Sequence, residues 1–282
     1  MISVDLMGGL GNQLFQIAVV IAYCVRERTT PIFPYSETLN VSVVRPTYWN
    51  TLFKKLKKFT TWDNTVFTNE TVYQFQRYFE PFFNYKEIPH GLENCMLTGY
   101  FQSYKYIEDC RSVVLDVTGL KDEQMKVMEE YGETSFFKNT TTISVHFRRG
   151  DYKVKQQFHP IMPYEYYDSA MDMLPLNFLE SSNVMYFCEE EDRVDVDEIM
   201  NKLKEKYNFT QMECVDHALP DWKQLLLMSI FQVNIIANSS FSWWAAYLND
   251  NPNKTVICPT TWFGPELPCN TSEMCPPDWI RI

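Results

Sequence analysis

The sequence predicts an α/β protein with parallel sheets, because short apolar strands alternate with helices along its second half. Three apolar runs have the length of buried strands, at residues 143–147, 184–188 and 233–237. A helical segment follows each of them, at residues 164–170, 195–207 and 238–246. A chain of 282 residues is long enough for two such domains or for one large domain.

The first segment of the chain predicts another strand, turn and helix. Residues 2–6 form a short apolar strand, residues 7–13 contain three glycines, and a buried helix is expected over residues 14–26. Glycine lets the backbone approach a ligand closely, and a helix start offers free N–H groups to an anion or a hydroxyl. The spacing is not Gly-x-Gly-x-x-Gly, so no dinucleotide site is predicted, and a simple tight turn is the alternative.

The middle of the chain is less regular. Residues 31–94 are rich in aromatic, Asn and Thr residues and fit long loops over the surface of an α/β domain. Residues 97–106 predict a strand end followed by a polar and aromatic loop. Residues 121–132 are charged and helical, which makes them a candidate crossing between domains.

The most informative stretch is residues 143–152, a strand that ends in charge. Apolar and polar residues alternate up to Phe147, and His146, Arg148, Arg149 and Asp151 then gather at the strand end. In open α/β sheets, ligands lie outside the carboxyl ends of strands. Adjacent guanidinium groups present fixed forks of donors to phosphate oxygens, so a diphosphate is the expected ligand. The alternative is a surface ion pair between the arginines and the aspartate.

A second strand, loop and helix follow at residues 233–246. The strand runs into Asn238, Ser239, Ser240, Phe241 and Ser242. Small hydroxyl residues at a helix start are first of all N-caps. They can equally donate to a phosphate, so we expect a second anion-binding turn within reach of the first.

Metal-binding patterns are weak in this sequence. The acids at residues 189–192 follow a strand and could hold a metal, but capping of the next helix is the preferred interpretation. The 8 cysteines show no Cys-x-x-Cys pair and no His at metal spacing, so neither a zinc site nor a dithiol motif is predicted. Cys269 and Cys275 are close enough in sequence to form a disulfide in an oxidising compartment, which the sequence leaves open.

Composition excludes several classes of partner. Acidic residues outnumber basic ones by 36 to 25, and the basic run at residues 54–58 is too short to follow a nucleic-acid backbone. The apolar run at residues 17–25 is far shorter than the ~20 residues that span a bilayer. With no secretory signal before the first strand, a soluble cytoplasmic chain is expected, and association with a membrane surface is left open.

Taken together, these segments resemble glycosyltransferase family 11, the inverting α-1,2-fucosyltransferases, nearly from end to end. The residues that carry the resemblance are Gly8-Gly9-Leu10-Gly11-Asn12-Gln13, Gly99-Tyr100-Phe101-Gln102-Ser103, His146-Phe147-Arg148-Arg149-Gly150-Asp151-Tyr152, Tyr166-Tyr167, Asn238-Ser239-Ser240-Phe241-Ser242-Trp243-Trp244 and Pro277-Asp278-Trp279-Ile280.

The resemblance implies a GT-B architecture, with two Rossmann-like domains facing across a cleft. Residues 1–135 would form the acceptor-side domain and residues 136–282 the nucleotide-sugar-binding domain. The implied reaction transfers L-fucose from GDP-fucose to the 2-hydroxyl of a galactosyl-type acceptor glycan, with inversion and without a metal or other cofactor. A transferase for a different nucleotide sugar, and a non-catalytic carbohydrate or nucleotide-sugar binder on the same fold, are the alternatives.

The resemblance also implies roles for individual residues. Arg148 would neutralise the leaving diphosphate in place of a metal ion, and His146 would lie near the ribose or the base. Asp151 is the candidate general base, and its alternative role is to orient Arg148 or His146. The remaining donor-binding candidates are Arg149, Asp221, Asn238, Ser239, Ser240, Phe241 and Ser242, and those on the acceptor side are Gly11, Asn12 and Gln13.

Two positions depart from the pattern of similar enzymes. An acid usually precedes the Leu-Met-Ser helix segment, where it can bind guanine, and this chain has Gln224 there. Asp221, one turn earlier, is the candidate substitute. At the end of the strand over residues 184–188, Cys188 stands where a serine usually precedes the acidic pair.

Overall fold

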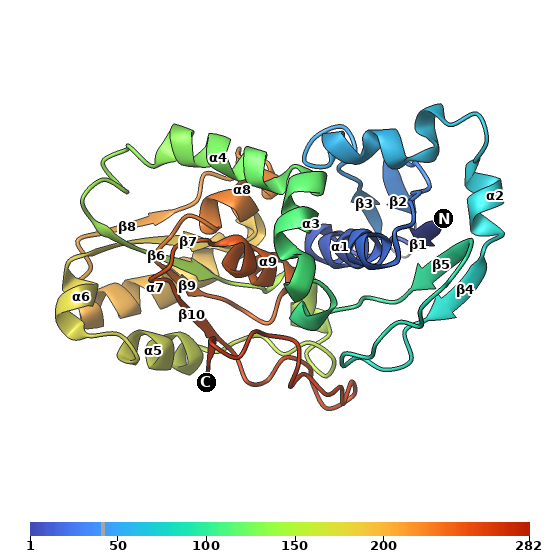
Figure 1. Cartoon of the computed structure of the whole chain (residues 1–282). Coiled ribbons are helices and arrows are strands. Elements are labelled where there is room, and N and C mark those ends of the chain that lie inside the picture. The colour runs from blue at the N-terminus through green and yellow to red at the C-terminus, as the bar shows by residue number, and fades with distance from the viewer. Residues whose placement is uncertain (41–42) are drawn as a thin grey trace. The chain divides into compact units, whose positions relative to one another are not determined.

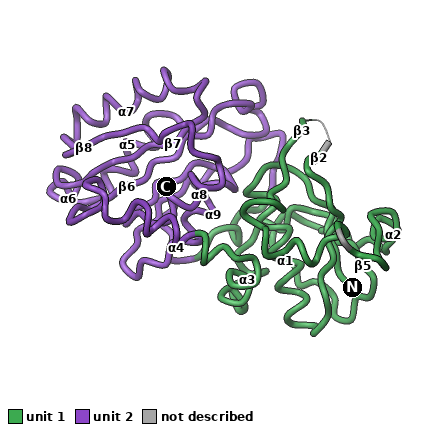
Figure 2. Tube along the Cα trace, turned by 90° about the horizontal axis from the view of Figure 1, so that it is seen from above, with its two compact units in different colours: residues 1–123, 270–276 green, residues 124–269, 277–282 purple. Residues whose placement is uncertain are grey.

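The computed structural model describes residues 1–40 and 43–282, which divide into two compact units (Figure 2). Unit 1 comprises residues 1–123 and 270–276, and unit 2 comprises residues 124–269 and 277–282. The expected boundary at 135/136 differs from this division, which falls within helix α4 (Leu120–Tyr131). The late segment belongs to unit 1 because Ser103 donates a hydrogen bond to the Glu273 carbonyl and Lys105 pairs with the Glu273 carboxylate.

Unit 1 is built on a three-stranded parallel sheet in the order β1-β5-β4. Its strands are β1 (Ile2–Val4), β5 (Cys95–Thr98) and β4 (Gln76–Phe79). A separate pair, β2 (Thr38–Asn40) and β3 (Val44–Pro46), is antiparallel, so the expectation of parallel pairing throughout is wrong here. A parallel crossover needs about a dozen residues, and the connection between these strands is far shorter.

Helix α1 (Leu10–Glu27) is the centre of unit 1 and begins four residues before the expected start at Leu14. Gly8, at φ +81°, makes a left-handed turn after β1, and Gly9 is the N-cap residue. All but one of the residues from Leu10 to Cys24 are buried, which is typical of a helix enclosed in a core. The candidate residues Gly11, Asn12 and Gln13 therefore lie in the first turns of a helix and not in a loop.

The rest of unit 1 consists of short helices. These are α2 (Asn69–Tyr73), α3 (Arg111–Thr118) and four 3₁₀ helices, Lys54–Phe59, Thr61–Asp63, Tyr104–Tyr106 and Glu108–Cys110. The basic run forms the first of these 3₁₀ helices, with Leu56 buried and its lysines largely toward solvent. Lys54 pairs with Glu123 at 2.9 Å and Lys55 with Asp122 at 2.6 Å.

Unit 2 contains a six-stranded sheet in the order β11-β10-β9-β6-β7-β8, with every neighbouring pair parallel. The strands are β6 (Thr141–His146), β7 (Ser182–Phe187), β8 (Gln211–Cys214), β9 (Val233–Ile235), β10 (Thr255–Cys258) and β11 (Ile280–Arg281). The chain moves outward from β6 to β8 and then returns to the other side of β6 with β9. This is the strand order of the Rossmann fold, and its topological switch point lies between β6 and β9.

Helices cover both faces of this sheet (Figure 1). Helices α5 (Tyr164–Asp172), α6 (Leu176–Glu180) and α7 (Arg193–Tyr207) lie on one face. Helices α4, α8 (Asp221–Met228) and α9 (Ser240–Leu248) lie on the other. Gln124 of α4 donates to Ser229 Oγ at 2.8 Å and to the Leu248 carbonyl at 3.0 Å, which joins α4 to the ends of α8 and α9. The main helices expected from the sequence are confirmed to within a few residues.

Within the described ranges, 1–40 and 43–282, no helix combines the length and the apolar character needed to cross a bilayer. All eight cysteines lie in these ranges, and none of them forms a disulfide bond.

Candidate functional site

The candidate donor site lies at the carboxyl edge of the unit 2 sheet. In the strand register, His146 at the end of β6 lies opposite Phe187 of β7, and Val145 lies opposite Ile235 of β9. Two segments that follow these strands therefore meet at the switch point: the arginine turn, residues 147–152, and the serine turn, residues 238–242. Crevices at such switch points are where open α/β sheets bind ligands. The sequence predicted both turns.

Direct contacts join the two turns. The Tyr152 hydroxyl donates to the Asn238 carbonyl at 3.2 Å. The ring of His146 lies 5.6 Å from the ring of Phe241, measured between centroids. The guanidinium of Arg148 lies over the Tyr152 ring, 5.0 Å from its centroid. Residues about 90 positions apart in sequence thus form one polar and aromatic surface.

Arg148 is held between two carboxylates. Its guanidinium donates to Asp151 and to Glu189, and its side chain is only 19% exposed. Burial alone would lower the pKa of Arg148, but the charges of Glu189 and Asp151 outweigh burial and raise it. The ion pair with Asp151 that the sequence left open is therefore present. The same guanidinium could exchange these two carboxylates for the oxygens of one phosphate, which accept two of its N–H groups at once.

Asp192 binds two residues of the arginine turn and the segment after it. Its buried carboxylate accepts the Gly150 N–H at 2.7 Å and pairs with Lys153 at 2.6 Å. Asp195 pairs with Arg149 at 3.3 Å. Asp192 is the N-cap residue of α7, at the helix start where acids were expected, but its side chain makes no cap hydrogen bond. The Asp192 carboxylate instead binds the Gly150 N–H and Lys153.

His146 is buried and uncharged. Burial, assisted by the positive charge of Arg148, lowers the pKa of His146 to about 3. Its Nδ1 atom has no hydrogen-bond partner among the residues the structure describes, and the same is true of Arg149 Nε and Asn238 Oδ1. Buried polar atoms are nearly always hydrogen-bonded, so these atoms, at or just after the ends of β6 and β9, are positions where a bound ligand or water can complete the site.

The other amide atom of Asn238 fixes the direction of its free oxygen. Asn238 Nδ2 donates to the carbonyls of Pro160 and Trp262, at 2.9 and 3.0 Å. Because the amide is held by two carbonyls, Oδ1 is a preorganised acceptor. The donor-binding candidate Asn238 thus combines a structural role with an unused polar atom.

The serine turn opens helix α9. Ser239 Oγ accepts the Phe241 N–H at 3.3 Å and so confirms the N-cap expected from the sequence. Ser242 is fully buried and donates back to the Ser239 carbonyl at 3.4 Å, which occupies its hydroxyl within the helix. Ser240 is partly exposed in the first turn of α9, the end of a helix at which an anion is favoured.

Asp221 and Gln224 lie on α8, after β8. Asp221 begins this helix, is exposed, and accepts the Trp222 N–H at 2.7 Å. Gln224 Nε2 donates to the Leu219 carbonyl at 2.7 Å and thereby holds the loop that precedes the helix. The position that departs from similar enzymes is thus occupied by a side chain that stabilises its own loop.

The acceptor-side candidates lie in unit 1. Gln13 is buried and donates to the carbonyls of Gly8 and Pro46, at 3.1 and 2.9 Å. Asn12 Oδ1 accepts from Gln102 Nε2 at 2.7 Å. The start of α1 is thereby joined to the stretch after β5, so two of the motifs that carry the family resemblance form one polar network.

Sequence reasoning missed four features of unit 2. These are the pairing of Glu189 with Arg148, the support of Arg148 by Tyr152, the contact of Asp192 with Gly150, and a cluster of Cys188, Cys214 and His217. The acids at a strand end and the tyrosine in the turn were visible signals. The cluster had one local signal, the Cys-x-x-His spacing of Cys214 and His217, so the expectation of no His at metal spacing is wrong. Cys188 joins them from the end of β7, which no short spacing indicates.

Fold and site together define a class: two α/β units with parallel sheets, one of them of Rossmann strand order with two neighbouring arginines at its switch point. This is the GT-B fold of nucleotide-sugar-dependent glycosyltransferases. A search of solved structures supports the fold: ADP-heptose lipopolysaccharide heptosyltransferase II of E. coli superposes with a TM-score of 0.52 at 11% identity, covering 100% of this chain and 89% of that one.

Residues 1–282 match the model of glycosyl transferase family 11, so the chain belongs to this family and the resemblance is confirmed. A similar protein is the O-antigen biosynthesis glycosyltransferase WbnK of Escherichia coli, 27% identical over 204 residues, which are 68% of this chain and 64% of that protein. Another is an alpha-1,2-colitosyltransferase of Escherichia coli, 32% identical over 148 residues, or 51% of this chain and 48% of that protein. The chain spans less than two thirds of the length of either relative.

Proposed function

We propose that this chain is an inverting, metal-independent glycosyltransferase that transfers L-fucose from GDP-fucose to the 2-hydroxyl of a galactosyl-type acceptor glycan. The observation that carries the proposal is a set of three buried polar atoms without partners among the described residues: His146 Nδ1, Arg149 Nε and Asn238 Oδ1. All three belong to segments that end or follow β6 and β9, the strands at the switch point of a Rossmann-type sheet in a family 11 chain. A nucleoside diphosphate has the hydroxyls, ring nitrogens and anionic oxygens to complete them.

Arg148 serves the leaving group in this proposal. As the bond from the sugar to the β-phosphate breaks, positive charge develops on the sugar and negative charge on the diphosphate. A guanidinium that is already placed and permanently charged stabilises that negative charge without rearrangement. The first turn of α9 supplies further N–H donors, so arginine and helix together take the role of a divalent cation.

His146 contacts the nucleoside in this proposal. Its low pKa keeps the ring neutral at physiological pH, so one nitrogen donates and the other accepts a hydrogen bond. A neutral ring suits a ribose hydroxyl or a base edge and avoids adding charge beside Arg148. The neighbouring ring of Phe241 adds an aromatic surface.

Asp151 is the proposed general base. It lies three residues after Arg148 and accepts a hydrogen bond from it, which places a carboxylate next to the leaving-group cation. In a single displacement the acceptor hydroxyl attacks the face of the sugar opposite the diphosphate, and its proton passes to this carboxylate. A single displacement converts the β-linked donor into an α-linked product, whereas retention would require a carboxylate nucleophile on the opposite face of the sugar.

The test combines donor choice with product stereochemistry. The purified chain is incubated with GDP-fucose and other nucleotide sugars, each with a panel of galactose-ended acceptors, and nucleotide release is followed with and without acceptor. We expect acceptor-dependent GDP release and an α-fucoside, identified by the coupling constant of its anomeric proton. A β-fucoside would contradict the mechanism. Binding without turnover for every pair would indicate a non-catalytic carbohydrate or nucleotide-sugar binder.

A second candidate function is transfer of a different sugar. The motivation is the similarity to an alpha-1,2-colitosyltransferase, together with Gln224 at the position where an acid is usual. Gln224 donates to the Leu219 carbonyl, and unlike a carboxylate it adds no negative charge for a guanine N–H group to meet. A higher kcat/KM for another nucleotide sugar than for GDP-fucose in the same panel would favour this function.

A further inference from the structure

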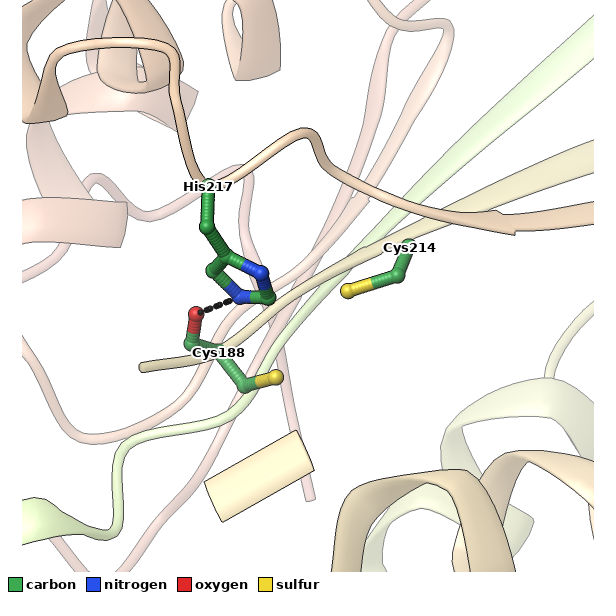
Figure 3. A group of neighbouring side chains, drawn as sticks. All are labelled: Cys188, Cys214 and His217. Atoms are coloured by element: carbon green, nitrogen blue, oxygen red, sulfur yellow. Dashed lines mark hydrogen bonds between the residues drawn. The ribbon is translucent and has the colours of Figure 1, made fainter. Parts of the chain in front are cut away.

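Three potential metal ligands converge beside the candidate donor site in unit 2 (Figure 3). Cys188 follows β7, Cys214 ends β8, and His217 lies in the loop between β8 and α8. The two sulfur atoms and one ring nitrogen all lie within 4.8 Å of one another. The strand register explains the pairing of the cysteines: Cys214 lies opposite Tyr186, and Cys188, two residues further on, points to the same face of the sheet.

The histidine is oriented as metal-binding histidines usually are. His217 Nε2 lies 3.1 Å from the Cys188 carbonyl oxygen, which can only accept, so Nε2 carries the proton (Figure 3). In the neutral ring this leaves the lone pair on Nδ1. Metal-bound imidazoles usually donate their other N–H group to a backbone carbonyl or a carboxylate. This hydrogen bond fixes which ring nitrogen binds the metal.

The distances suit a tetrahedral ion after small movements. Thiolate sulfur lies about 2.3 Å and imidazole nitrogen about 2.0 Å from zinc, which separates neighbouring ligand atoms by roughly 3.5 to 3.8 Å. Atoms within 4.8 Å of one another reach this arrangement by side-chain rotations of about 1 Å. Thiolate and imidazole are ligands that select zinc over magnesium or calcium.

We propose that Cys188, Cys214 and His217 form a three-ligand site for a zinc ion, separate from the diphosphate contacts and beyond the proposed transferase activity. Cys214 and His217 are only half-buried, so the fourth position is accessible to water. Binding releases the two thiol protons to solvent, and no electron transfer is involved.

The site would connect two segments of the donor-binding unit. Cys188 immediately precedes Glu189, whose carboxylate pairs with Arg148. His217 lies in the loop that leads to Asp221 at the start of α8. An ion at this position fixes the end of β7 to that loop, and so stabilises the surroundings of the arginine turn without contacting the diphosphate.

Cobalt binding tests the proposal directly. Metal-free full-length protein, kept reduced, is titrated with Co²⁺, and thiolate coordination is detected by a near-ultraviolet charge-transfer band. We expect the band to saturate at one equivalent, to disappear on addition of Zn²⁺, and to be accompanied by a rise in melting temperature when zinc is added. A wild-type protein with no such band would overturn the proposal, whatever its transferase activity.

Variants assign the ligands. Cys214→Ser and His217→Asn should each weaken zinc binding by at least about 100-fold in competition with a chromogenic chelator. Cys269→Ser, which removes a partly exposed thiol outside the cluster, should bind as wild type does. Zinc affinity unchanged in both cluster variants would overturn the assignment. If a variant does not fold, the wild-type cobalt spectrum decides how many thiolates bind the ion. Its charge-transfer intensity rises with the number of bound thiolates.

A Cys188 to Cys214 disulfide is the competing use of the same thiols. It would be recognised by mass spectrometry of protein purified without reductant, as a loss of two hydrogens that links the two cysteine peptides. Quantitative formation of this bond, together with the absence of a cobalt band after reduction, would show a redox pair and contradict the zinc site.

Discussion

The guanidinium of Arg148 lies over the ring of Tyr152, with Arg148 Cζ 5.0 Å from the ring centroid. The Tyr152 hydroxyl donates to the Asn238 carbonyl at 3.2 Å, and its ring stacks on His159, 4.8 Å away. Tyr152 thus supports the cation on one side and binds the serine turn on the other. The position of Arg148 depends on both turns, which leads to the predictions below.

Replacing Arg148 tests its contact with the leaving group. Arg148→Ala should reduce kcat by at least about 100-fold, because losing a charge-assisted contact to a developing phosphate charge costs about 3 kcal/mol or more. Arg148→Lys should restore little, since an ammonium lacks the fork of donors. Lys202→Ala, which removes an exposed positive charge from α7, serves as control. A folded Arg148→Ala protein with more than about a tenth of wild-type turnover would refute the assignment.

Asp151 and Glu189 offer a matched pair of variants, since both carboxylates accept from the same guanidinium. If Asp151 is the general base, Asp151→Asn should lower kcat by about 100-fold or more, while Glu189→Gln retains more than about a tenth of it. Steady-state kinetics with saturating acceptor measures both. Equal losses in the two variants would show that Asp151 only orients Arg148.

Gly150 lies where a side chain would meet Glu189. A Cβ atom there would fall 1.9 Å from Glu189 Oε2, whereas a Cβ atom at Gly91 would meet nothing within 4 Å. Both glycines have positive φ, so each alanine variant should lose about 1 kcal/mol of stability from the backbone alone. Only Gly150→Ala should also raise the donor KM, by about tenfold or more, because it displaces the Glu189 carboxylate that pairs with Arg148. Similar donor KM values in the two variants would show that the contact of residue 150 with Glu189 does not affect donor binding.

Chelation tests metal independence at the diphosphate. Because Arg148 and the first turn of α9 are expected to meet the phosphate charge, more than about half of the transferase activity should persist in EDTA. Added Mg²⁺ or Mn²⁺ should not stimulate the reaction. Complete loss in EDTA that Mn²⁺ restores and Zn²⁺ does not would make the acids at residues 189–192 metal ligands.

Glu80 predicts a pH-dependent stability of unit 1. Burial raises the pKa of Glu80 from 4.5 to about 7, even though its carboxylate accepts the N–H groups of Tyr100 and Phe101. The folded protein therefore binds more protons than the unfolded chain between these values, and the free energy of unfolding falls as pH rises through this range. The total change is up to about 3 kcal/mol.

Glu80→Gln keeps an acceptor for both N–H groups but carries no charge. Above about pH 7 this variant should be more stable than wild type by roughly 1 to 3 kcal/mol, and below about pH 4.5 the advantage should vanish. Urea denaturation across this pH range measures the difference. Glu93→Gln, at an exposed acid of the same unit, is the control. Parallel pH profiles for wild type and Glu80→Gln would show that Glu80 ionises normally.

The sequence by itself determined the elements and the chemistry at their ends. Apolar periodicity is a local property, so β6, β7 and α7 were predictable, and the change from apolar to charged residues after Phe147 marked the anion site. Ser239 was identified as an N-cap because capping depends on residues only a few positions away. The two turns and their family resemblance therefore needed no structure.

The tertiary structure decided which of these ends meet. The register that places β9 beside β6 joins the arginine and serine turns across about 90 residues, and it arises from the packing of a whole sheet. The same long-range packing directs Glu189 to Arg148 and Asp192 to Gly150, where local rules predicted helix capping. Cys188 meets Cys214 and His217 for the same reason. Sequence spacing encodes contacts within one turn of a helix or one hairpin, and contacts between parallel strands depend on crossovers that only the folded chain specifies.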